Sequence, residues 1–217
     1  MTSGASSESE HRKAHWDDRY QGIGVESVSW YQTHPRTSLE LIDLLEVAPS
    51  TAVIDVGGGA STLVDALVQR GFGDITVLDI SAVALSKSRR RLTRPAGVTW
   101  LHSDLLTWRP DRRWGVWHDR AVFHFLTASD DQATYMEKMR SALRPGGAFV
   151  IGAFAADGPR YCSGLPVVGY DASTLIDRIG AVLGDIRIVG HQSESHVTPS
   201  GGVQPFTWIA GLAGLRK

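Results

Sequence analysis

The sequence lacks the features that mark secreted and membrane proteins. Its single cysteine, Cys162, excludes an intrachain disulfide framework and favours a reducing cytosol. No apolar run approaches the roughly 18 residues that cross a bilayer. The first residues, MTSGASSESE, are polar and lack the hydrophobic region of a signal peptide. We therefore expect a cytoplasmic protein that does not associate with a membrane.

An excess of one charge is also missing. The 22 basic and 23 acidic side chains leave a formal net charge of -1, and no long basic run suggests a surface for nucleic acid. The histidines form no close cluster, and His11 and His15 have helical spacing without a nearby glutamate pattern, so no metal site is expected. What remains, 217 residues with 42% apolar side chains, suits one domain with a full hydrophobic core.

The chain is organised around residues 51–61, TAVIDVGGGAS. A short apolar run that carries Asp55 predicts a buried strand, three glycines follow it, and a helix is expected over 63–69. Such a turn without side chains, next to a helix N-terminus, lets a ligand touch backbone. A second predicted strand, 74–79, ends in Asp79, where a carboxylate can accept both hydroxyls of a ribose. The pattern predicts the nucleoside-binding half of a doubly wound α/β domain.

Two classes of cofactor use this arrangement. A nicotinamide dinucleotide site favours G-x-G-x-x-G, and here Thr62 stands at the third glycine position. The run D-V-G-G-G-A-S instead resembles motif I of class I S-adenosylmethionine-dependent methyltransferases. That resemblance implies S-adenosyl-L-methionine as cofactor and S-adenosyl-L-homocysteine as product. The cofactor-binding residues that it implies in the first two strand ends are Asp55, Gly57, Gly58, Gly59, Asp79, Ile80 and Ser81.

Later segments carry the same resemblance. After a third predicted strand, 98–102, Asp104 and Leu105 match the family positions that receive the adenine amino group and a ring nitrogen. LRPGG, at 143–147, resembles the turn that precedes the fifth strand in this family. The strands expected at 185–194 and 204–211 are joined so closely that they must pair antiparallel. The resemblance covers residues 10–217 and implies a doubly wound, mostly parallel seven-stranded sheet with a C-terminal antiparallel hairpin.

The N-terminal part is expected to be a lid. Residues 1–9 are predicted to be a disordered tail, 10–48 a helical lid, and 51–217 a Rossmann-like core. WDDRY followed by SWYQ resembles the N-terminal segment that folds over the cofactor in many small methyltransferases; alternatively, these aromatic residues only cover the sheet edge. The residues expected in the lid and substrate pocket are Trp16, Tyr20, Trp30, Tyr31, Arg120 and Tyr161.

The fourth predicted strand, 115–119, ends at the ligand crevice of an open α/β sheet. His118, Asp119 and His124 are therefore the candidate catalytic residues, and His118 is also placed beside the cofactor. Methyl transfer from a sulfonium depends on binding and orientation, so a base helps only an acceptor that holds a proton. Either histidine could serve as that base, and Asp119 could orient an amine or bind Arg120.

Three functions remain open at this stage. The first is a methyltransferase, monomeric or homodimeric, that acts on a small molecule with an N, O or S acceptor. The second is a protein lysine methyltransferase, because G-x-G-x-S-x-L and Trp30-Tyr31 also resemble the elongation-factor-modifying group; HDRAVFHF replaces that group's acidic motif after the fourth strand. The third is an NAD-dependent oxidoreductase or a non-enzymatic nucleoside-binding module.

Overall fold

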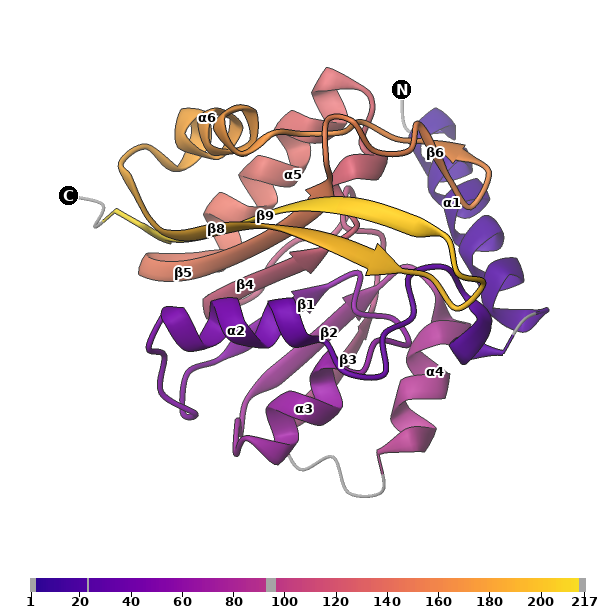
Figure 1. Ribbon diagram of the computed structural model, residues 1–217, viewed down its shortest axis with the longest axis horizontal. Helices are drawn as coiled ribbons and strands as arrows, with labels where there is room; N and C mark the ends of the chain where they lie inside the picture. The colour runs from indigo at the N-terminus through magenta and orange to yellow at the C-terminus, as the bar shows by residue number, and fades with distance from the viewer. Residues whose placement is uncertain (1–2, 23, 93–96, 215–217) are drawn as a thin grey trace.

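The computed structural model describes residues 3–22, 24–92 and 97–214. At its centre lies a seven-stranded sheet with the order β3-β2-β1-β4-β5-β9-β8 (Figure 1). The strands of this sheet are β1 (Val53–Val56), β2 (Ile75–Asp79), β3 (Val98–His102), β4 (Trp114–Arg120), β5 (Leu143–Phe154), β8 (Ile186–Val197) and β9 (Val203–Ala213). The first five are parallel, and β9 pairs antiparallel with both β5 and β8. The predicted fold class is confirmed.

Helices cover both faces of the sheet. In Figure 1, α2, α3 and α4 lie on one side of the strands, and α5 and α6 lie on the other. The helices are α1 (Ser3–Gln21), α2 (Arg36–Leu44), α3 (Leu63–Gln69), α4 (Ala82–Arg91), α5 (Ser129–Ala142) and α6 (Ala172–Leu183), with 3-10 turns η1 (Val25–Ser27) and η2 (Phe123–Phe125). Among the described residues, no helix combines the length and the apolar character needed to cross a bilayer.

The central strand shows why the sheet is buried on both sides. All four residues of β1 are buried, and successive side chains point to opposite faces. Val53 packs in the core that α2, α3 and α4 cover, whereas Ile54 and Val56 pack in the core beneath α5 and α6. Strands that are covered on two faces are usually continuous apolar runs in the sequence. The short apolar run at 53–56 therefore predicted this strand.

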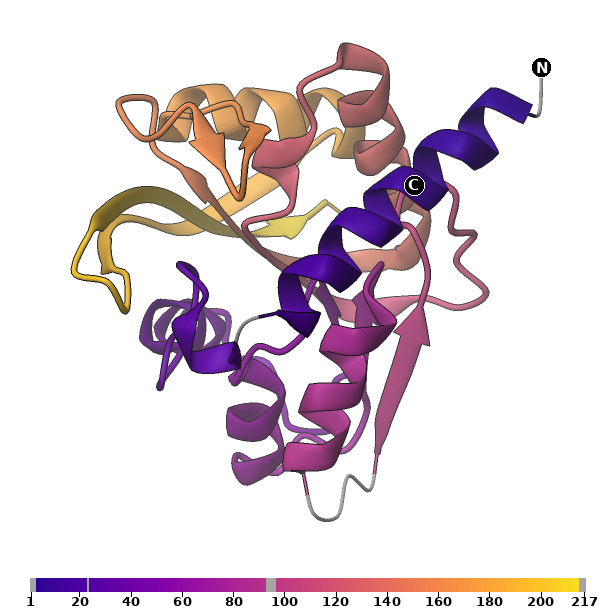
Figure 2. The same cartoon turned by 90° about the vertical axis from the view of Figure 1, so that its right-hand side faces the viewer.

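The order of the strands brings the ends of β3, β2, β1 and β4 to one edge of the domain. Helix α1 runs across this edge (Figure 2). Its side chains bond residues that follow β3 and β2, through Arg12 with Asp104 and Asp17 with Ser81. The helix therefore covers the crevice in which the sequence placed a ligand.

Two segments differ from expectation. LRPGG was expected as a turn but begins β5, where Leu143 pairs with Trp114 and the register then shifts. Gly146, with φ of +70°, accommodates this irregularity, because positive φ costs a glycine little. The segment 157–170, for which no strand was expected, contains a short hairpin, β6 (Tyr161–Cys162) with β7 (Leu165–Pro166).

The N-terminal helix also begins earlier than predicted. Residues 3–9 were expected to be disordered, yet they continue α1, whereas residues 1–2 lie outside the described part. Polar composition suggested a tail because these residues offer no apolar face. Serine and glutamate are nevertheless acceptable in a helix, and the following turns of α1 are fixed by bonds to the core.

Candidate functional site

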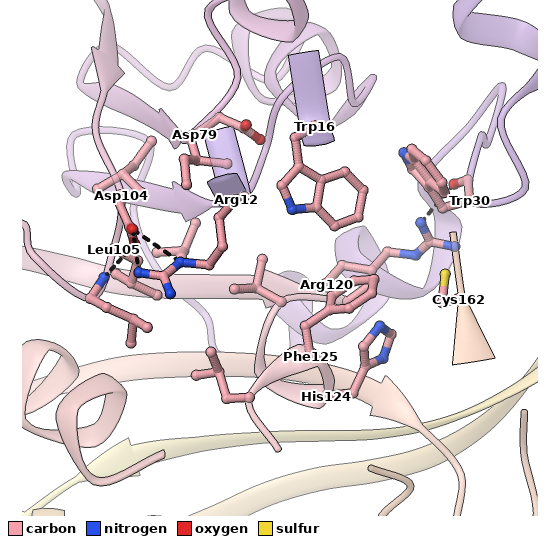
Figure 3. A pocket seen from close by; sticks show the side chains of 18 of the residues that line it. Arg12, Trp16, Trp30, Asp79, Asp104, Leu105, Arg120, His124, Phe125 and Cys162 are labelled. Atoms are coloured by element: carbon pink, nitrogen blue, oxygen red, sulfur yellow. Dashed lines mark hydrogen bonds and ion pairs between the residues drawn. The ribbon is translucent and has the colours of Figure 1, made fainter. Parts of the chain in front are cut away.

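A cavity lies under α1 at the ends of β3, β2, β1 and β4 (Figure 3). The predicted residues that line it are Trp16, Tyr20, Trp30, Gly57, Asp79, Ile80, Asp104, Leu105, Arg120 and His124. A smaller hollow adjoins it on the other side of the glycine turn and shares Tyr20, Trp30, Gly57 and Arg120 with it. The hollow adds Tyr31, Asp55, Gly58 and His118 to its wall. Most of the residues chosen from sequence therefore surround one connected space.

The glycine turn leaves backbone bare at the centre of this space. Gly57 has φ of +66°, and a Cβ placed there would lie 2.0 Å from Cγ2 of Val122. Gly59 has φ of +40°, and its Cβ would lie 2.7 Å from Oδ2 of Asp79. A Cβ on Gly58 would lie 2.3 Å from Oδ2 of Asp55. Conformation and space both require glycine here, and the turn matches the close backbone approach that the motif predicts.

Asp79 is held at the wall of the cavity instead of pointing into bulk water. The residue is 7% exposed, and its Oδ1 accepts a hydrogen bond from the backbone N–H of Ser81. Burial raises the pKa of this carboxyl to about 7, helped by the nearby acids Asp55 and Asp17 and opposed by N–H groups of Ser81 and Gly59. Keeping this buried carboxyl ionised therefore costs free energy unless further hydrogen-bond donors reach it. The two hydroxyls of a ribose would be such donors.

Ser81 stands behind Asp79 instead of lining the cavity. Its Oγ caps α4 by accepting from the backbone N–H of Ala84, and it donates to Oδ1 of Asp17 on α1. Asp17 also accepts from the backbone N–H of Val83. The start of α4 is therefore a docking point for α1.

Asp104 is already paired with an arginine of α1. Nε and Nη2 of Arg12 donate to its Oδ2 at 3.1 and 2.7 Å, while Oδ1 accepts from the backbone N–H of Leu106 (Figure 3). The arginine side chain is 33% exposed and the aspartate 7%. An adenine amino group directed at Asp104 would have to share or displace this pair.

We expect Arg12→Ala to bind S-adenosylhomocysteine up to about fivefold more tightly than the wild type, because a partly exposed ion pair contributes up to about 1 kcal/mol. The effect should shrink in high salt, which screens the pair in the wild type. Calorimetry at two ionic strengths measures it. Arg112→Ala, which removes the exposed pair with Asp74, is the matched control. Weaker binding by Arg12→Ala would mean that Arg12 contributes to the bound state.

Aromatic side chains of the N-terminal segment form the outer wall. The ring of Trp16 lies edge-on to Trp30 and Phe125, at centroid distances of 5.8 and 5.0 Å. Figure 3 places Trp16 between the Arg12–Asp104 pair and Arg120. Nε1 of Trp30 donates to the hydroxyl of Tyr20, which is buried beside the glycine turn. These rings contact each other and the end of β4, so the segment is packed onto the cavity.

The acid of β1 faces the smaller hollow. Oδ1 of Asp55 accepts from Nδ1 of His118 at 2.7 Å, and Nε2 of His118 lies 2.9 Å from Oγ of Ser38. Both ring nitrogens of His118 are therefore engaged with buried partners. Oδ2 of Asp55 is buried and has no hydrogen-bond partner among the described residues. This leaves a buried acceptor beside the turn for a donor from a ligand.

Two polar residues near the end of β4 have different surroundings. Asp119 is fully buried, lines neither hollow, and accepts from the hydroxyl of Tyr135 and from backbone N–H groups of Val122 and Phe123. Burial raises its pKa to about 6 against these bonds. It holds the turn η2 in place. His124, in that turn, lines the cavity.

The remaining residue of the predicted pocket lies outside it. Tyr161 is 68% exposed and lines neither hollow, whereas its buried neighbour Cys162 lines the cavity. The two alternate across the short strand β6, and sequence could not say which of them faces inward. Burial raises the pKa of the Cys162 thiol, so the thiol is a poor nucleophile.

Several lining residues were missed. Arg12 lies one helical turn before Trp16 and two before Tyr20, so their i, i+4 spacing could have indicated that it shares a helix face with them. Phe154, Gln204 and Phe206 come from β5 and β9. No local pattern marks them, because pairing between strands distant in sequence brings them to the site.

The family model and the curated relatives that match this chain are described as methyltransferases. Residues 53–147 match a family model described as a methyltransferase domain. The eEF1A lysine and N-terminal methyltransferase homolog of Drosophila melanogaster is 27% identical over 147 residues, which cover 63% of this chain and 21% of that protein. The chain therefore spans about a fifth of the length of this relative.

Solved structures extend the likeness to nearly the whole chain. A structure from work on the conversion of a disulfide bond into a thioacetal group during echinomycin biosynthesis has a TM-score of 0.72 at 18% identity, and covers 95% of this chain and 94% of that one. The Burkholderia thailandensis 1,6-didemethyltoxoflavin-N1-methyltransferase, solved with 1,6-didemethyltoxoflavin and S-adenosylhomocysteine, has a TM-score of 0.67 at 17% identity, covering 97% and 88%. At these identities the likeness shows the fold.

Proposed function

We propose that this chain, a class I S-adenosylmethionine-dependent methyltransferase, transfers the methyl group to an N, O or S atom of a small, flat molecule. The observation that carries the proposal is the cavity between the glycine turn and α1. One part of its wall presents Asp79 and bare backbone, and the other is built from aromatic rings. A space of this kind suits one polar cofactor and one apolar acceptor.

The residues present fit the cofactor. Asp79 would accept the ribose hydroxyls, Asp104 and the backbone at Leu105 would meet the adenine, and the bare turn would lie against the amino-acid part. Oδ2 of Asp55, buried and unpartnered, would accept from the cofactor's amino group. When bound, S-adenosylmethionine supplies a sulfonium methyl, whose bond to sulfur breaks as the bond to the acceptor forms, with the electron pair left on sulfur.

The chain's own residues contribute position and exclusion of water. Trp16, Trp30 and Phe125 enclose the acceptor space, and holding the two reactants in line can contribute roughly 7–11 kcal/mol. A proton released by the acceptor goes to solvent in this proposal. His124 is a poor base at neutral pH, because burial and the charge of Arg120 lower its pKa to about 3.

A protein lysine methyltransferase is the second candidate, supported by the 27% identity with the Drosophila relative. The charge of the cavity disfavours it. Arg120 lines the cavity, and the structure gives it no ion pair with any carboxylate in the described part of the chain. A lysine ammonium group entering the cavity would meet the like charge of this cation.

Incubation with methyl-labelled S-adenosylmethionine and a cell lysate separates the two candidates. We expect label in the small-molecule extract and none in protein bands, with a Gly57→Ala variant as the inactive control. Label in a protein band would reverse the order. Calorimetry with S-adenosylhomocysteine and with NAD tests the shared premise, since binding of NAD alone would eliminate both candidates.

A further inference from the structure

Three donor nitrogens on two residues that line the cavity are buried and lack hydrogen-bond partners among the described residues. Nη1 of Arg120 donates to the carbonyl of Trp30, but Nε and Nη2 are buried without a hydrogen bond in the described structure. Nδ1 of His124 accepts from the backbone N–H of Phe154 at 3.2 Å, so the proton of the neutral ring is on Nε2, which is also buried and unpartnered. Buried donors are rarely left unsatisfied, and three in one cavity indicate a ligand that accepts.

These donors lie on the far side of the cavity from the ribose acid. The guanidinium carbon of Arg120 is 5.0 Å from the ring centroid of Phe206, and the His124 ring is 6.3 Å from the same centroid. Phe206 belongs to β9, which three strands of the sheet separate from β2 and Asp79. Figure 3 shows Arg120 and His124 together, apart from Asp79 and Asp104. Arg120 and His124 therefore lie at the end of the cavity that is distant from Asp79, where the proposed acceptor would bind.

No carboxylate in the described part of the chain forms a direct ion pair with Arg120, although Glu194 and Asp55 lie near enough to raise its pKa. The nearby acid Glu194 accepts from Gln32 and Trp208, and Asp55 accepts from His118. Burial lowers the pKa of Arg120 to about 10, which still leaves it charged at neutral pH. His124 is neutral there for the reasons given above. A buried cation without a direct ion pair is costly, and an anionic ligand would form one.

We propose, on the basis of the methyltransferase function above, that the acceptor is an aromatic or otherwise flat carboxylic acid whose carboxylate binds Arg120 and His124. Nε and Nη2 of Arg120 offer the paired donors that match two carboxylate oxygens, and Nε2 of His124 adds a third. The rings of Phe125, Phe154 and Trp16 enclose the apolar body. Anchoring the carboxylate on the β9 side leaves the rest of the molecule to extend toward the glycine turn.

Three small probes test the charge of the ligand. Benzoate, benzamide and benzylamine share a ring and differ in charge, and each is titrated into the protein saturated with S-adenosylhomocysteine, followed by calorimetry or ligand-observed NMR. We expect benzoate to bind at least about tenfold more tightly than benzamide, the usual difference for charge-assisted hydrogen bonds, and benzylamine not to bind. Equal binding of benzoate and benzamide, or no binding of benzoate at millimolar concentrations, overturns the proposal.

The variant Arg120→Met tests whether Arg120 causes the preference for benzoate. We expect it to lose the preference for benzoate while its affinity for S-adenosylhomocysteine stays within about twofold; methionine fills an arginine's volume without burying a charge, so the fold should survive. Arg120→Lys keeps the charge and should retain the preference with weaker binding. Arg178→Met, which removes an exposed arginine bonded to Gln132, is the control and should behave as wild type.

Two other outcomes are decisive. If Arg120→Met lowers the affinity for S-adenosylhomocysteine at least about tenfold and leaves the affinity for benzoate unchanged, Arg120 binds the cofactor's own carboxylate and the proposal fails. If the wild type does not bind S-adenosylhomocysteine, the methyltransferase function fails first. The benzoate titration without cofactor still shows whether the anion site exists.

Discussion

Gly57→Ala is expected to weaken binding of S-adenosylhomocysteine by roughly 100-fold, about 3 kcal/mol. Two physical effects combine. An alanine at φ of +66° is strained by about 1–2 kcal/mol. Its Cβ would also lie 2.0 Å from Cγ2 of Val122, whose backbone N–H is fixed by Asp119. Either the turn or Val122 has to move, and both line the cavity.

Gly71→Ala separates strain from the clash. Gly71 also has positive φ, +83°, but a Cβ there meets nothing within 4 Å. We expect this control to lose about 1 kcal/mol of unfolding free energy and to bind S-adenosylhomocysteine normally. Adding Val122→Ala to Gly57→Ala removes Cγ2 and should restore part of the affinity, which a double-mutant cycle measures. Full affinity in Gly57→Ala alone would show that the ligand does not use this turn.

The sequence predicted those parts of the fold that local chemistry determines. The bounds of α3 and β3 match the prediction, because an apolar strand and a turn with glycine leave little choice. Ser81 also stands where a serine favours the start of a helix, and it caps α4. By contrast, LRPGG was expected as a turn and is strand, since its pairing depends on the position of Trp114 in a distant strand.

One half of the candidate site could also be predicted from the sequence, and the other half could not. The half that would bind the cofactor follows strand ends of a known order, so Gly57, Asp79 and Asp104 could be placed from sequence. The acceptor half depends on contacts between elements distant in sequence. Phe206 reaches the cavity only because β9 pairs with β5. Tyr161 lies outside it because it alternates with the buried Cys162 along β6, which pairs with β7. Neither relation has a short-range signal.

Asp79 carries the second large effect that we predict. Asp79→Ala should weaken S-adenosylhomocysteine by about 1.5–3 kcal/mol, or roughly 10- to 150-fold, the range for hydrogen bonds to a charged group. Asp74→Ala is the matched control, because Asp74 immediately precedes the same strand, is exposed, and pairs only with Arg112 among the described residues. Calorimetry at pH 8, where the carboxyl is ionised, gives the comparison. Unchanged affinity in Asp79→Ala would mean that the ribose lies elsewhere.

The raised pKa of Asp79 makes both stability and binding depend on pH. The carboxyl has a pKa of about 7 when folded and about 4 when unfolded, so between these values the folded state holds a proton that the unfolded chain has released. Its contribution to the unfolding free energy therefore falls as pH rises from about 4 to 7, and it is constant above that range. Asp79→Asn cannot ionise and should remove this slope from a denaturant series.

The affinity for the ligand should change with pH in the opposite direction to the stability. The ionised carboxylate accepts both ribose hydroxyls, whereas the protonated form cannot, so affinity for S-adenosylhomocysteine should rise as pH increases toward 7 and level off above it. Each pH unit below the folded pKa costs up to about tenfold, because the proton must leave before the ligand binds. Calorimetry in buffers of different ionisation enthalpy should detect that released proton at pH 6 and lose it at pH 8.5. Asp79→Asn should bind weakly at both values without releasing a proton, and a proton still released by this variant would assign the titration to another group.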